Sequence, residues 1–552
     1  MTKPIKDSKK PLQEPSWWSR NWFYIVLISL AVTGVFSAFF VPPLIPGLTN
    51  DGNSVVSVRQ GILAVLAGAL TMLTLSETHR KNTYEKNRNE RDHTRQVLAE
   101  RRSRYARAVE QLADEKAAVR LGGIYTLVGL VDEWLADDAL ELEEQQKEGQ
   151  VIINNLCSYV RAPFLLVTKT EYLQADVDVA PANYVGDFVA DQAMFREEQD
   201  VRRTIFAEIS NRSSTFTKDK NGNVFVSPGA WSDFDFDFSW APIFYPLSNL
   251  TIEKAIFSSA KFYGDANFLK TSFIQNVDFS QATFNGKAKF NGSKFAQEAT
   301  FNEVVFNEVA DFSDQGDVKT FFGGKASFNR AQFTHEANFN GATFASNANF
   351  SRAYFLGNAY FTNEAYVTRN ASPLNTMKYS GVTFAGNASF RQATFVHSAN
   401  FRETTFVRSA NFKEVDFKDT AIFHDTVFTR KVDFGGALFR SCANFNEATF
   451  KGSVGFNKAT FTNAEPIFAA MCWHARFSAL LNPQDYCFSV TKESKPIRCG
   501  TAALLGKSFI IPLGTLLFDP DSWDEEKQEY TRASEPAKPL DNSNNGKDDN
   551  PE

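Results

Sequence analysis

Cysteine and histidine are scarce in this chain of 552 residues, which contains five Cys and six His. Five Cys in a chain of this length exclude a disulfide-stabilised scaffold and favour a reducing compartment. The six His, at positions 79, 93, 335, 397, 424 and 474, show no metal-ligand spacing. The sequence also lacks a GxGxxG segment, a phosphate-binding loop and an HExxH motif. We therefore expect no catalytic, cofactor-binding or metal-binding residues, no cofactor and no enzymatic activity.

One group of candidate metal ligands needs a separate argument. Cys472, His474, Cys487 and Cys499 lie near one another in the sequence and could in principle bind zinc. No Cys-x2-Cys pair is present, and the spacings match no ordinary zinc site. We favour reduced, buried thiols in a C-terminal cap.

Neither charge nor hydropathy is unusual overall, but one residue type is. The chain has 58 Lys+Arg against 64 Asp+Glu, and 43% of its residues are hydrophobic. These values are typical of globular proteins and exclude wholesale disorder. Phe, in contrast, occurs 54 times, while Tyr occurs 15 times and Trp 8 times. The excess of Phe therefore calls for a structural reason.

Two apolar segments near the N-terminus predict a transmembrane helical hairpin over residues 22–76. Residues 23–41 carry no charge, and about twenty apolar residues span the ~30 Å hydrocarbon core. The second segment, 62–75, becomes long enough when it is extended back to Val55. Pro42, Pro43, Pro46 and Gly47 interrupt the chain between them. A cleaved signal peptide is the alternative for the first segment, and a buried core helix is the alternative for the second.

Basic residues flank the predicted hairpin on both sides and predict its orientation. They are Lys3, Lys6, Lys9, Lys10 and Arg20 before it, and Arg80, Lys81, Lys86, Arg88, Arg91, Arg95, Arg101, Arg102, Arg104 and Arg107 after it. We expect the hairpin to lie in the inner cell membrane. The positive-inside rule then places both termini, including the N-terminal tail 1–21, in the cytoplasm. The bilayer is thus an expected partner, and the small residues Ala64 and Gly68 would suit self-association of the spans.

Residues 77–162 are expected to form a basic, helical connector. Apolar residues recur at helical offsets up to Leu112, and Asp114 offers an N-cap for a second helix. An acidic break at 136–149 precedes a third helix, which Pro163 should end. Residues 163–233 read as a helical or irregular linker, with 200–212 as one more helix.

The Phe residues from position 257 onward are spaced alternately five and six residues apart. The first block runs from 257 to 312, the second from 322 to 361, and the third from 384 to 461. On a helix, positions five apart lie about 140° from each other, so the rings would form two divergent stripes. Asn, Gly, Thr and Ser between them also disfavour a helix. A solenoid remains, in which each short face contributes one inward ring and then turns a corner.

Ala stands two positions before many of these Phe residues, and the two side chains point the same way on an extended face. The repeated ANF and ATF units resemble the pentapeptide-repeat family. The resemblance implies a mainly β fold over 234–465, a right-handed quadrilateral β-helix with four short faces per coil. The eleven-residue double step adds one residue at every second corner, so we expect ~22 residues per coil and about nine coils.

A second resemblance covers residues 104–161. RYARAVEQLADEKAAVRLGGIYTLVGLVDEW, followed by IINNLCSYVR, is similar to the helical segment that precedes the repeats in membrane-bound bacterial pentapeptide-repeat proteins. We expect Gly122 and Gly123 within it to permit close helix packing; a binding role is the alternative.

Two breaks interrupt the Phe spacing. Residues 313–321 lose one Phe, at Asp317, and residues 367–381 form an insertion that should protrude from one face as a loop. After the repeats we expect a C-terminal cap over 466–518. Residues 519–552 hold eleven Asp+Glu against four Lys+Arg, which predicts an acidic, disordered tail.

Together these features favour a non-enzymatic, membrane-anchored scaffold that presents the solenoid to an unidentified cytoplasmic protein partner. The alternative by family analogy is a DNA mimic that modulates a topoisomerase. Such a mimic needs a strongly anionic rod, whereas residues 250–465 contain 22 Lys+Arg and 19 Asp+Glu. We therefore expect neither this role nor a nucleic-acid partner. An enzyme hidden in 162–233 would have too short a chain and no convincing set of catalytic residues.

Overall fold

The structure is a computed structural model that describes residues 17–44, 52–174, 180–218, 224–245, 247, 254–314, 318–362, 381–527 and 529–540. The chain divides into two compact units, Met1–Ser103 and Arg104–Glu552. Three predictions lie wholly or largely outside the described residues: the N-terminal tail up to residue 16, the loop at 367–381 except Gly381, and the tail from residue 541.

The first unit contains two long antiparallel helices. They are α1 (Trp17–Phe40), which is followed by the short η1 (Pro42–Leu44), and the first part of α2 (Gly52–Leu112). Residues late in α1 contact residues early in α2, as in the cation–π contact of Arg59 with Phe39. Residues early in α1 contact residues further along α2, as in the cation–π contact of Lys81 with Tyr24. Helix α2 runs without a break across the predicted boundary at 76.

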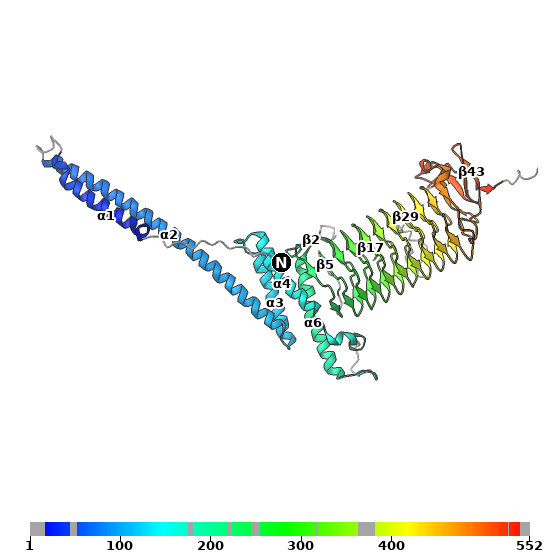
Figure 1. The fold of residues 1–552 in the computed structure, drawn as a ribbon, viewed down its shortest axis with the longest axis horizontal. Helices are drawn as coiled ribbons and strands as arrows, with labels where there is room; N and C mark the ends of the chain where they lie inside the picture. Colours follow the sequence, from blue (N-terminus) through cyan, green and yellow to red (C-terminus); the bar gives the residue numbers. More distant parts are fainter. Residues whose placement is uncertain are drawn as a thin grey trace, which may run out of the picture. The chain divides into compact units, whose positions relative to one another are not determined.

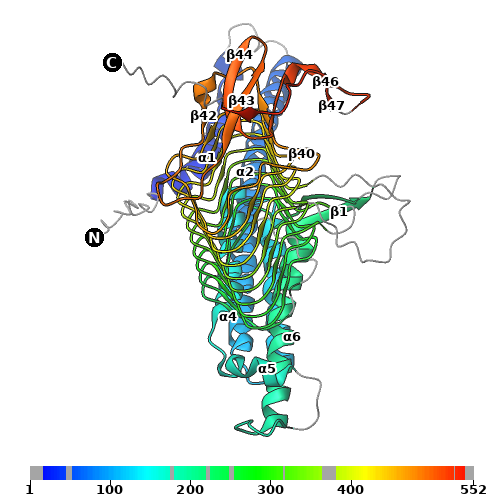
Figure 2. The same cartoon turned by 90° about the vertical axis from the view of Figure 1, so that its right-hand side faces the viewer.

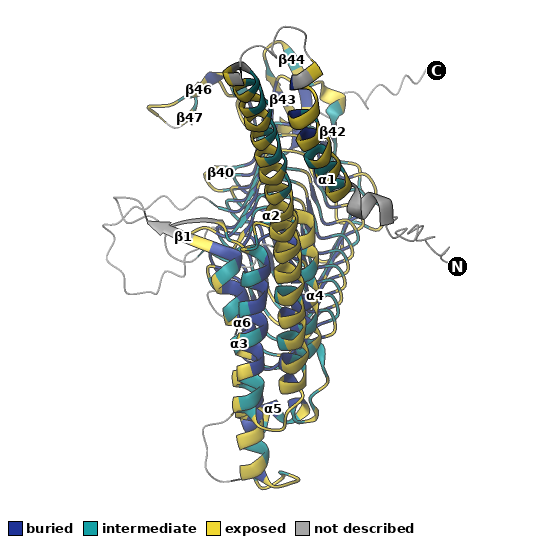
Figure 3. Cartoon of the chain, turned by 90° about the vertical axis from the view of Figure 1, so that its left-hand side faces the viewer, coloured by how far each residue is buried: buried dark blue, intermediate teal, exposed yellow. Residues whose placement is uncertain are grey.

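The apolar side chains of both helices lie on the outside. Val32 and Phe36 of α1 are each 62% exposed, and Val65 and Met72 of α2 are 74% and 77% exposed. Figure 3 shows this exposure as yellow along α2. Both helices are long and apolar enough to cross a membrane. Such surfaces are unfavourable in water and favourable in a lipid environment.

The second unit begins with a helical bundle, which we call the head. It contains the last turns of α2, α3 (Ala117–Leu135), α4 (Leu142–Arg161), η2 (Leu165–Lys169), α5 (Thr170–Leu173), α6 (Phe188–Ser213) and the hairpin β1 (Ser214–Lys218)–β2 (Val224–Pro228). Its apolar core includes Ile124, Leu127, Ile153, Leu156 and Ile205.

Two details of the head correct the sequence analysis. The N-cap of α3 is Lys116 and not the expected Asp114. Asp114 lies two residues earlier, and its side chain accepts a hydrogen bond from the backbone N–H of Lys116 at 2.8 Å. Helix α4 begins at Leu142, inside the segment expected to be an acidic break. Glu143 and Glu144 occupy its first turn, where their carboxylates interact favourably with the helix dipole and stabilise the helix. Helix α4 together with η2 and α5 is also long and apolar enough to form a membrane span with a 45° bend. Most of the apolar residues of α4 are, however, buried within the head, among them Ile152, Ile153, Leu156 and Val160.

The rest of the second unit is an array of four parallel sheets, here called walls 1 to 4 (Figure 1). From β5 to β38, each strand pairs with the strand four positions away in chain order. Wall 1 contains β3 (Phe236–Asp237), β5 (Ala255–Ile256), β9 (Val277–Asp278), β13 (Ala299–Thr300), β17 (Ala326–Ser327), β21 (Ala348–Asn349), β25 (Ala388–Ser389), β29 (Ala410–Asn411), β33 (Val432–Asp433), β37 (Val454–Gly455) and β42 (Tyr486–Cys487). Wall 2 contains β4 (Pro242–Ile243), β6 (Lys261–Phe262), β10 (Thr283–Phe284), β14 (Val305–Phe306), β18 (Gln332–Phe333), β22 (Tyr354–Phe355), β26 (Thr394–Phe395), β30 (Asp416–Phe417), β34 (Leu438–Phe439) and β38 (Thr460–Phe461).

Wall 3 contains β7 (Ala266–Asn267), β11 (Ala288–Lys289), β15 (Ala310–Asp311), β19 (Ala337–Asn338), β23 (Ala359–Tyr360), β27 (Ala399–Asn400), β31 (Ala421–Ile422) and β35 (Ala443–Asn444). Wall 4 contains β8 (Ser272–Phe273), β12 (Lys294–Phe295), β16 (Phe321–Phe322), β20 (Thr343–Phe344), β24 (Thr383–Phe384), β28 (Thr405–Phe406), β32 (Val427–Phe428), β36 (Thr449–Phe450), β41 (Arg476–Ser478) and β45 (Leu516–Phe518). Thr283 lies opposite Lys261 and Val305, so one coil takes 22 residues, as predicted.

The Phe rings fill the interior as four stacks, one per wall. In the stack beside wall 3, Phe312 lies 4.8 Å from Phe290 and 4.9 Å from Phe339, with nearly parallel rings. Rings of different stacks meet edge to face, as Phe339 and Phe350 do at 5.3 Å. Both geometries are favourable for aromatic pairs. The rings and the Ala residues two positions before many of them are buried, as the sequence pattern predicts.

The corners alternate between two types. The corners from wall 1 to 2 and from wall 3 to 4 are β-turns: the N–H of Ala282 donates to the carbonyl of Phe279 at 3.0 Å, and Gln281 has a φ of 59°. In many of these turns an Asn or Asp directly precedes the inward Phe, and its side chain accepts a hydrogen bond from the backbone N–H two residues later in the chain. Asp278, for example, accepts from the N–H of Ser280 at 2.8 Å. These β-turn corners hold the extra residue, because four residues (279–282) separate β9 from β10, whereas three residues (285–287) separate β10 from β11 at the corner from wall 2 to wall 3. There, a Cβ added to Gly286 would lie 2.6 Å from backbone of the preceding coil.

Both breaks in the Phe spacing fall at the same corner, between walls 3 and 4. Strand β15 leads to β16, and Phe322 stacks on Phe295 of the coil before. Asp317 itself lies outside the described residues, but the walls on either side of the break keep their rings, Phe312 and Phe322. The expected loss of a Phe is therefore wrong: the break lengthens a corner by five residues. The second break separates β23 from β24, where Phe384 stacks on Phe344 in the same register.

A compact cap follows the last coil. It contains the antiparallel pairs β39 (Ala469–Ala470)–β40 (Trp473–His474), β43 (Cys499–Leu504)–β44 (Lys507–Pro512) and β46 (Trp523–Asp524)–β47 (Glu529–Tyr530). It also contains η3 (Pro483–Asp485), η4 (Pro520–Ser522) and β48 (Lys538–Pro539), which pairs with β43. The expectation of disorder from residue 519 is therefore wrong for the described residues up to Leu540 (Figure 2).

Candidate functional site

The outer surface of the array consists of ladders of side chains with one step per coil. Strands in register are spaced by about 4.8 Å, so each ladder offers equally spaced groups to a partner. On wall 4 the outward residues are mostly polar and change along the array: Ser272, Lys294, Phe321, Thr343, Thr383, Thr405, Val427, Thr449 and Arg476. Because the strands have only two or three residues, each wall is narrow and recognition must extend along the stack.

The corner between walls 1 and 2 carries a second, charged ladder. Gln281 and Arg330 donate to the two carboxylate oxygens of Glu303, at 3.1 and 2.9 Å. The hydrogen bond from Gln281, and then Arg330, lowers the pKa of Glu303. Further along, Gln392 donates to Glu414 at 2.6 Å and lowers its pKa in the same way. Exposed pairs of this kind contribute little to stability because solvent screens them, so they order the surface more than they stabilise it.

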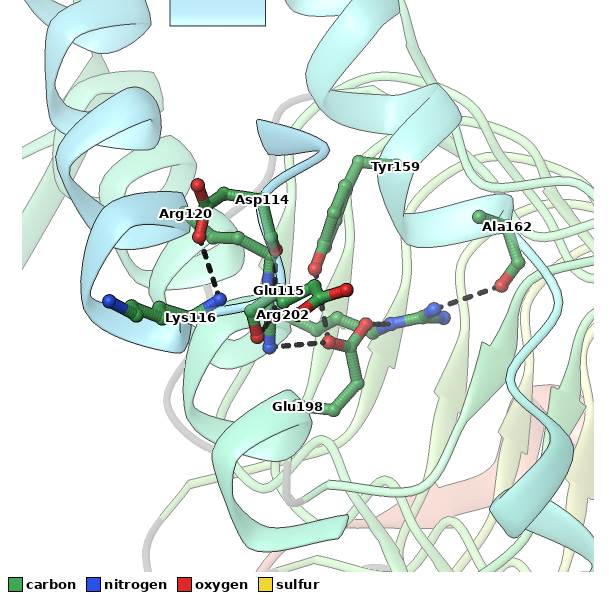
Figure 4. Close-up of polar contacts among 8 residues, drawn as sticks. All are labelled: Asp114, Glu115, Lys116, Arg120, Tyr159, Ala162, Glu198 and Arg202. Carbon is green, nitrogen blue, oxygen red and sulfur yellow. Dashed lines mark hydrogen bonds and ion pairs between the residues drawn. The ribbon is translucent and has the colours of Figure 1, made fainter. Parts of the chain in front are cut away.

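A buried polar cluster joins the helices of the head (Figure 4). Glu198 and Arg202 are one turn apart on α6, and Arg202 donates from Nε to Glu198 Oε1 at 2.7 Å. The other oxygen, Oε2, accepts from the Tyr159 hydroxyl at 3.0 Å and from Arg120 at 3.3 Å. Three donors from three helices therefore hold one carboxylate in place.

Arg202 also connects this cluster to the array. Its side chain is 2% exposed, and its two terminal nitrogens donate to the carbonyls of Val160 and Ala162, both at 2.9 Å. These carbonyls end α4, where the last turn of a helix lacks backbone partners. The guanidinium carbon lies 5.5 Å from the ring of Phe244, which follows β4 in the first coil.

The cluster is built to hold a structure rather than to transfer a proton. Burial, and then the charge of Glu198, raise the pKa of Tyr159, so its hydroxyl stays protonated and acts as a donor. Arg120 is held at the same time by the carbonyls of Asp114 and Glu115, at 3.0 and 2.8 Å. The sequence analysis expected a helix at 200–212 but missed this cluster. The i, i+4 spacing of Glu198 and Arg202 was the available signal.

The two adjacent glycines of α3 have different surroundings. A Cβ at Gly123 would lie 2.8 Å from the carbonyl oxygen of Ala108 in α2, so close helix packing is the reason for this glycine. A Cβ at Gly122 would meet nothing within 4 Å. The packing argument thus holds for Gly123 and is wrong for Gly122.

The five cysteines are free, and they differ in exposure. Cys472 is exposed, Cys487 and Cys499 are half-buried, and His474 lies with Nδ1 2.6 Å from the carbonyl oxygen of Gly514. The expectation of buried thiols is therefore wrong for Cys472. Burial raises the pKa of Cys499 to about 11 and that of Cys157 to about 12, which keeps both thiols protonated. In the part of the chain that the structure describes, no three His, Cys, Asp or Glu side chains are grouped to hold a metal.

Comparison with known families identifies the repeats. Residues 251–291, 269–314, 379–427, 396–438 and 423–465 match the family described as pentapeptide repeats (9 copies). The match supports a pentapeptide-repeat protein. The parallel sheets of the array fit a pentapeptide-repeat β-helix, and β16 to β23 continue the pentapeptide-repeat walls between the matched blocks. No curated protein and no solved structure matched the chain.

Proposed function

We propose that the chain is a non-enzymatic, membrane-anchored scaffold of the membrane-bound bacterial kind, whose pentapeptide-repeat walls bind a cytoplasmic protein. The observation that carries the proposal is the extended, ordered outer surface of the array, with four polar walls in constant register. Repeat arrays commonly bind partners along such surfaces. The exposed apolar side chains of α1 and α2 support the anchoring half.

The proposal includes an orientation with both termini in the cytoplasm. Its support is the clustering of Lys and Arg on the two outer flanks of the helical pair, where the positive-inside rule applies. It also includes the right-handed winding that the family resemblance implies, which an experimental density map of the array would test directly.

Cys472 provides a test of the orientation without any added tag. It is exposed in the turn between β39 and β40, whereas Cys157 is buried in α4. A membrane-impermeant maleimide should leave Cys472 unlabelled in intact cells and label it after permeabilisation. Cys472→Ser identifies its share of the signal, and Cys157 should react only after denaturation. Labelling of Cys472 in intact cells would contradict the orientation.

Site-specific crosslinking tests the scaffold role. A photo-crosslinking residue is placed at one outward position of each wall in the full chain: Asn411 on wall 1, Thr394 on wall 2, Asn338 on wall 3 and Thr343 on wall 4. We expect one protein to be crosslinked from one or two neighbouring walls. Equal, weak crosslinking to many proteins from all four positions would count against a specific partner.

The topoisomerase alternative receives no support from the charge of the array, which is balanced along 250–465. It would be revived if the purified chain inhibited DNA supercoiling.

A further inference from the structure

A cavity lies beside wall 4 at the C-terminal end of the array, and one side of it is formed by residues that the sequence analysis expected to be disordered. Its volume is about 560 Å³, within the ~300–1,000 Å³ range of small-molecule sites. Its floor is formed by four consecutive steps of wall 4: Val427, Thr449, Arg476 and Leu516. The pair β46–β47 forms its side.

The side of the cavity is aromatic and firmly held. Trp523 and Tyr530 lie opposite each other in β46–β47, with ring centroids 4.8 Å apart, and Phe518 lies 4.4 Å from Tyr530. The base of the pair is held by Asp519, a buried carboxylate that accepts from Arg532 at 2.7 Å. The aromatic surface is therefore in place before any ligand binds, which lowers the entropic cost of binding.

Two cations line the same cavity. Lys451 lies 5.6 Å from the Tyr530 ring, and Arg476 is half-buried. Among the described residues, no side-chain hydrogen bond or ion pair engages the guanidinium of Arg476. Asp425 also lines the cavity, and Arg476 is close enough to act on its charge without forming an ion pair. Glu529 of β47 is exposed and also lines the cavity.

Two other hollows of similar or larger size lack this combination. One, of about 580 Å³, contains Lys413 and Lys431, but both pair with Asp433, at 3.2 and 3.5 Å. The other, of about 840 Å³, is lined by Asp265 and Glu171 with no Lys or Arg. Only the cavity at wall 4 joins an unpaired guanidinium to an aromatic surface among these three.

We propose that this cavity binds a small aromatic carboxylate. The guanidinium of Arg476 presents a planar fork that matches a carboxylate in two hydrogen bonds, and the ring of the ligand packs on Trp523 and Tyr530. Lys451 and Arg476 are opposed in the lining by Asp425 and Glu529, so the hydrogen-bonding fork of Arg476, and not a net positive charge, selects the carboxylate. The proposal is independent of the scaffold role.

The test is binding of 2-naphthoate to the full chain in detergent micelles, measured by isothermal titration calorimetry, with 2-naphthamide as the neutral ligand of the same shape. We expect saturable binding at one site and at least tenfold weaker binding of the amide. Arg476→Gln should weaken naphthoate binding at least tenfold and remove the preference over the amide. Arg476→Lys, which keeps the charge but loses the fork, should lie between the two.

Arg330→Gln, at an exposed corner of the array, is the matched control and should bind as the original chain does. Trp523→Ala should weaken both ligands equally, and circular dichroism checks that each variant keeps its fold. Absence of saturable naphthoate binding at millimolar concentration would overturn the proposal. Equal affinity for naphthoate and naphthamide, or unchanged binding by Arg476→Gln, would overturn it as well.

Discussion

The array and the head use opposite means to fix a structure. In the array, each buried ring packs against copies of itself, so every coil solves the same packing problem in the same way. In the head, a single buried guanidinium joins two helices to the first coil through four separate contacts. The first strategy is redundant and the second is not. Each coil of the array therefore repeats the same stabilising contacts, whereas the head relies on contacts that occur only once.

The largest effect should come from removing one ring in the middle of a stack. Phe339→Ala empties a position between Phe312 and Phe361, whose rings lie 4.9 and 5.0 Å away, and we expect a loss of about 3–5 kcal/mol. Urea unfolding of the full chain measures it. Phe339→Leu should cost less than about 1.5 kcal/mol. A loss below 1 kcal/mol for the Ala variant would show that neighbouring coils close the gap.

Arg202→Met should be nearly as damaging, for a different reason. It leaves the buried carboxylate of Glu198 with less compensation and the carbonyls of Val160 and Ala162 without donors, which together cost about 3–5 kcal/mol. The double variant Arg202→Met/Glu198→Gln should recover part of this loss in the same unfolding assay. Arg330→Met, in an exposed pair, should change stability by less than about 1 kcal/mol. Equal losses for the two Met variants would remove the contrast between head and array.

Two glycines of the array separate steric from conformational demands. Gly286→Ala drives a Cβ to 2.6 Å from the backbone of the coil below, with an expected loss of about 1–3 kcal/mol. Gly436 has a φ of 68° and only Glu414 Cγ at 3.5 Å from an added Cβ, so Gly436→Ala should cost about 1 kcal/mol from backbone strain alone. Thermal unfolding ranks the two. The reverse order would mean that the coils can separate at the corner between walls 2 and 3.

The smallest effects should differ in sign between two glutamates of the array. Burial, and then the charge of Asp311, raise the pKa of Glu336, so its ionised form weakens the fold. Glu336→Gln should therefore raise the thermal midpoint at pH 7. The gain should fade as the pH falls through the raised pKa, because the original side chain then becomes neutral in the fold.

Glu303 is the matched opposite, since its folded pKa is lowered. Its stabilising contribution is present above the unfolded pKa and is lost as the pH falls through the folded one. Glu303→Gln should therefore lower the midpoint at pH 7 and approach the original chain at acid pH. Shifts of the same sign for both variants would contradict the assigned causes.

The array could be predicted from the sequence because its information is periodic. The spacing of Phe257, Phe262 and Phe268 already contains the 22-residue coil, the inward rings and the alternation of corners. The positions of Asn and Asp before many Phe residues are explained by the turns only once the backbone is known. The Phe spacing alone also could not distinguish a missing ring at Asp317 from a longer corner, which the pairing of Phe295 with Phe322 decides.

The head and the cap could not be predicted in the same detail, because their contacts do not repeat. Arg120 and Glu198 are 78 residues apart, and nothing in the spacing links them. Trp523 and Tyr530 lie in a segment whose acidic composition resembles disorder, yet they form part of a sheet and of the cavity at wall 4. Composition describes the average of a segment, while a few aromatic residues decide whether it folds.

The covered ends of the array bear on its behaviour at high concentration. A stack of parallel strands exposes unpaired backbone groups at both ends, and such edges promote fibre growth by adding further strands. At one end Gln150 donates to the carbonyl of Asp235 and Arg161 to that of Asp237, both at 2.9 Å, so side chains of α4 occupy groups that a new strand would use. At the other end, the C-terminal strands extend past the last coil. The occupied carbonyls at the N-terminal end of wall 1 thus disfavour the addition of a further strand there.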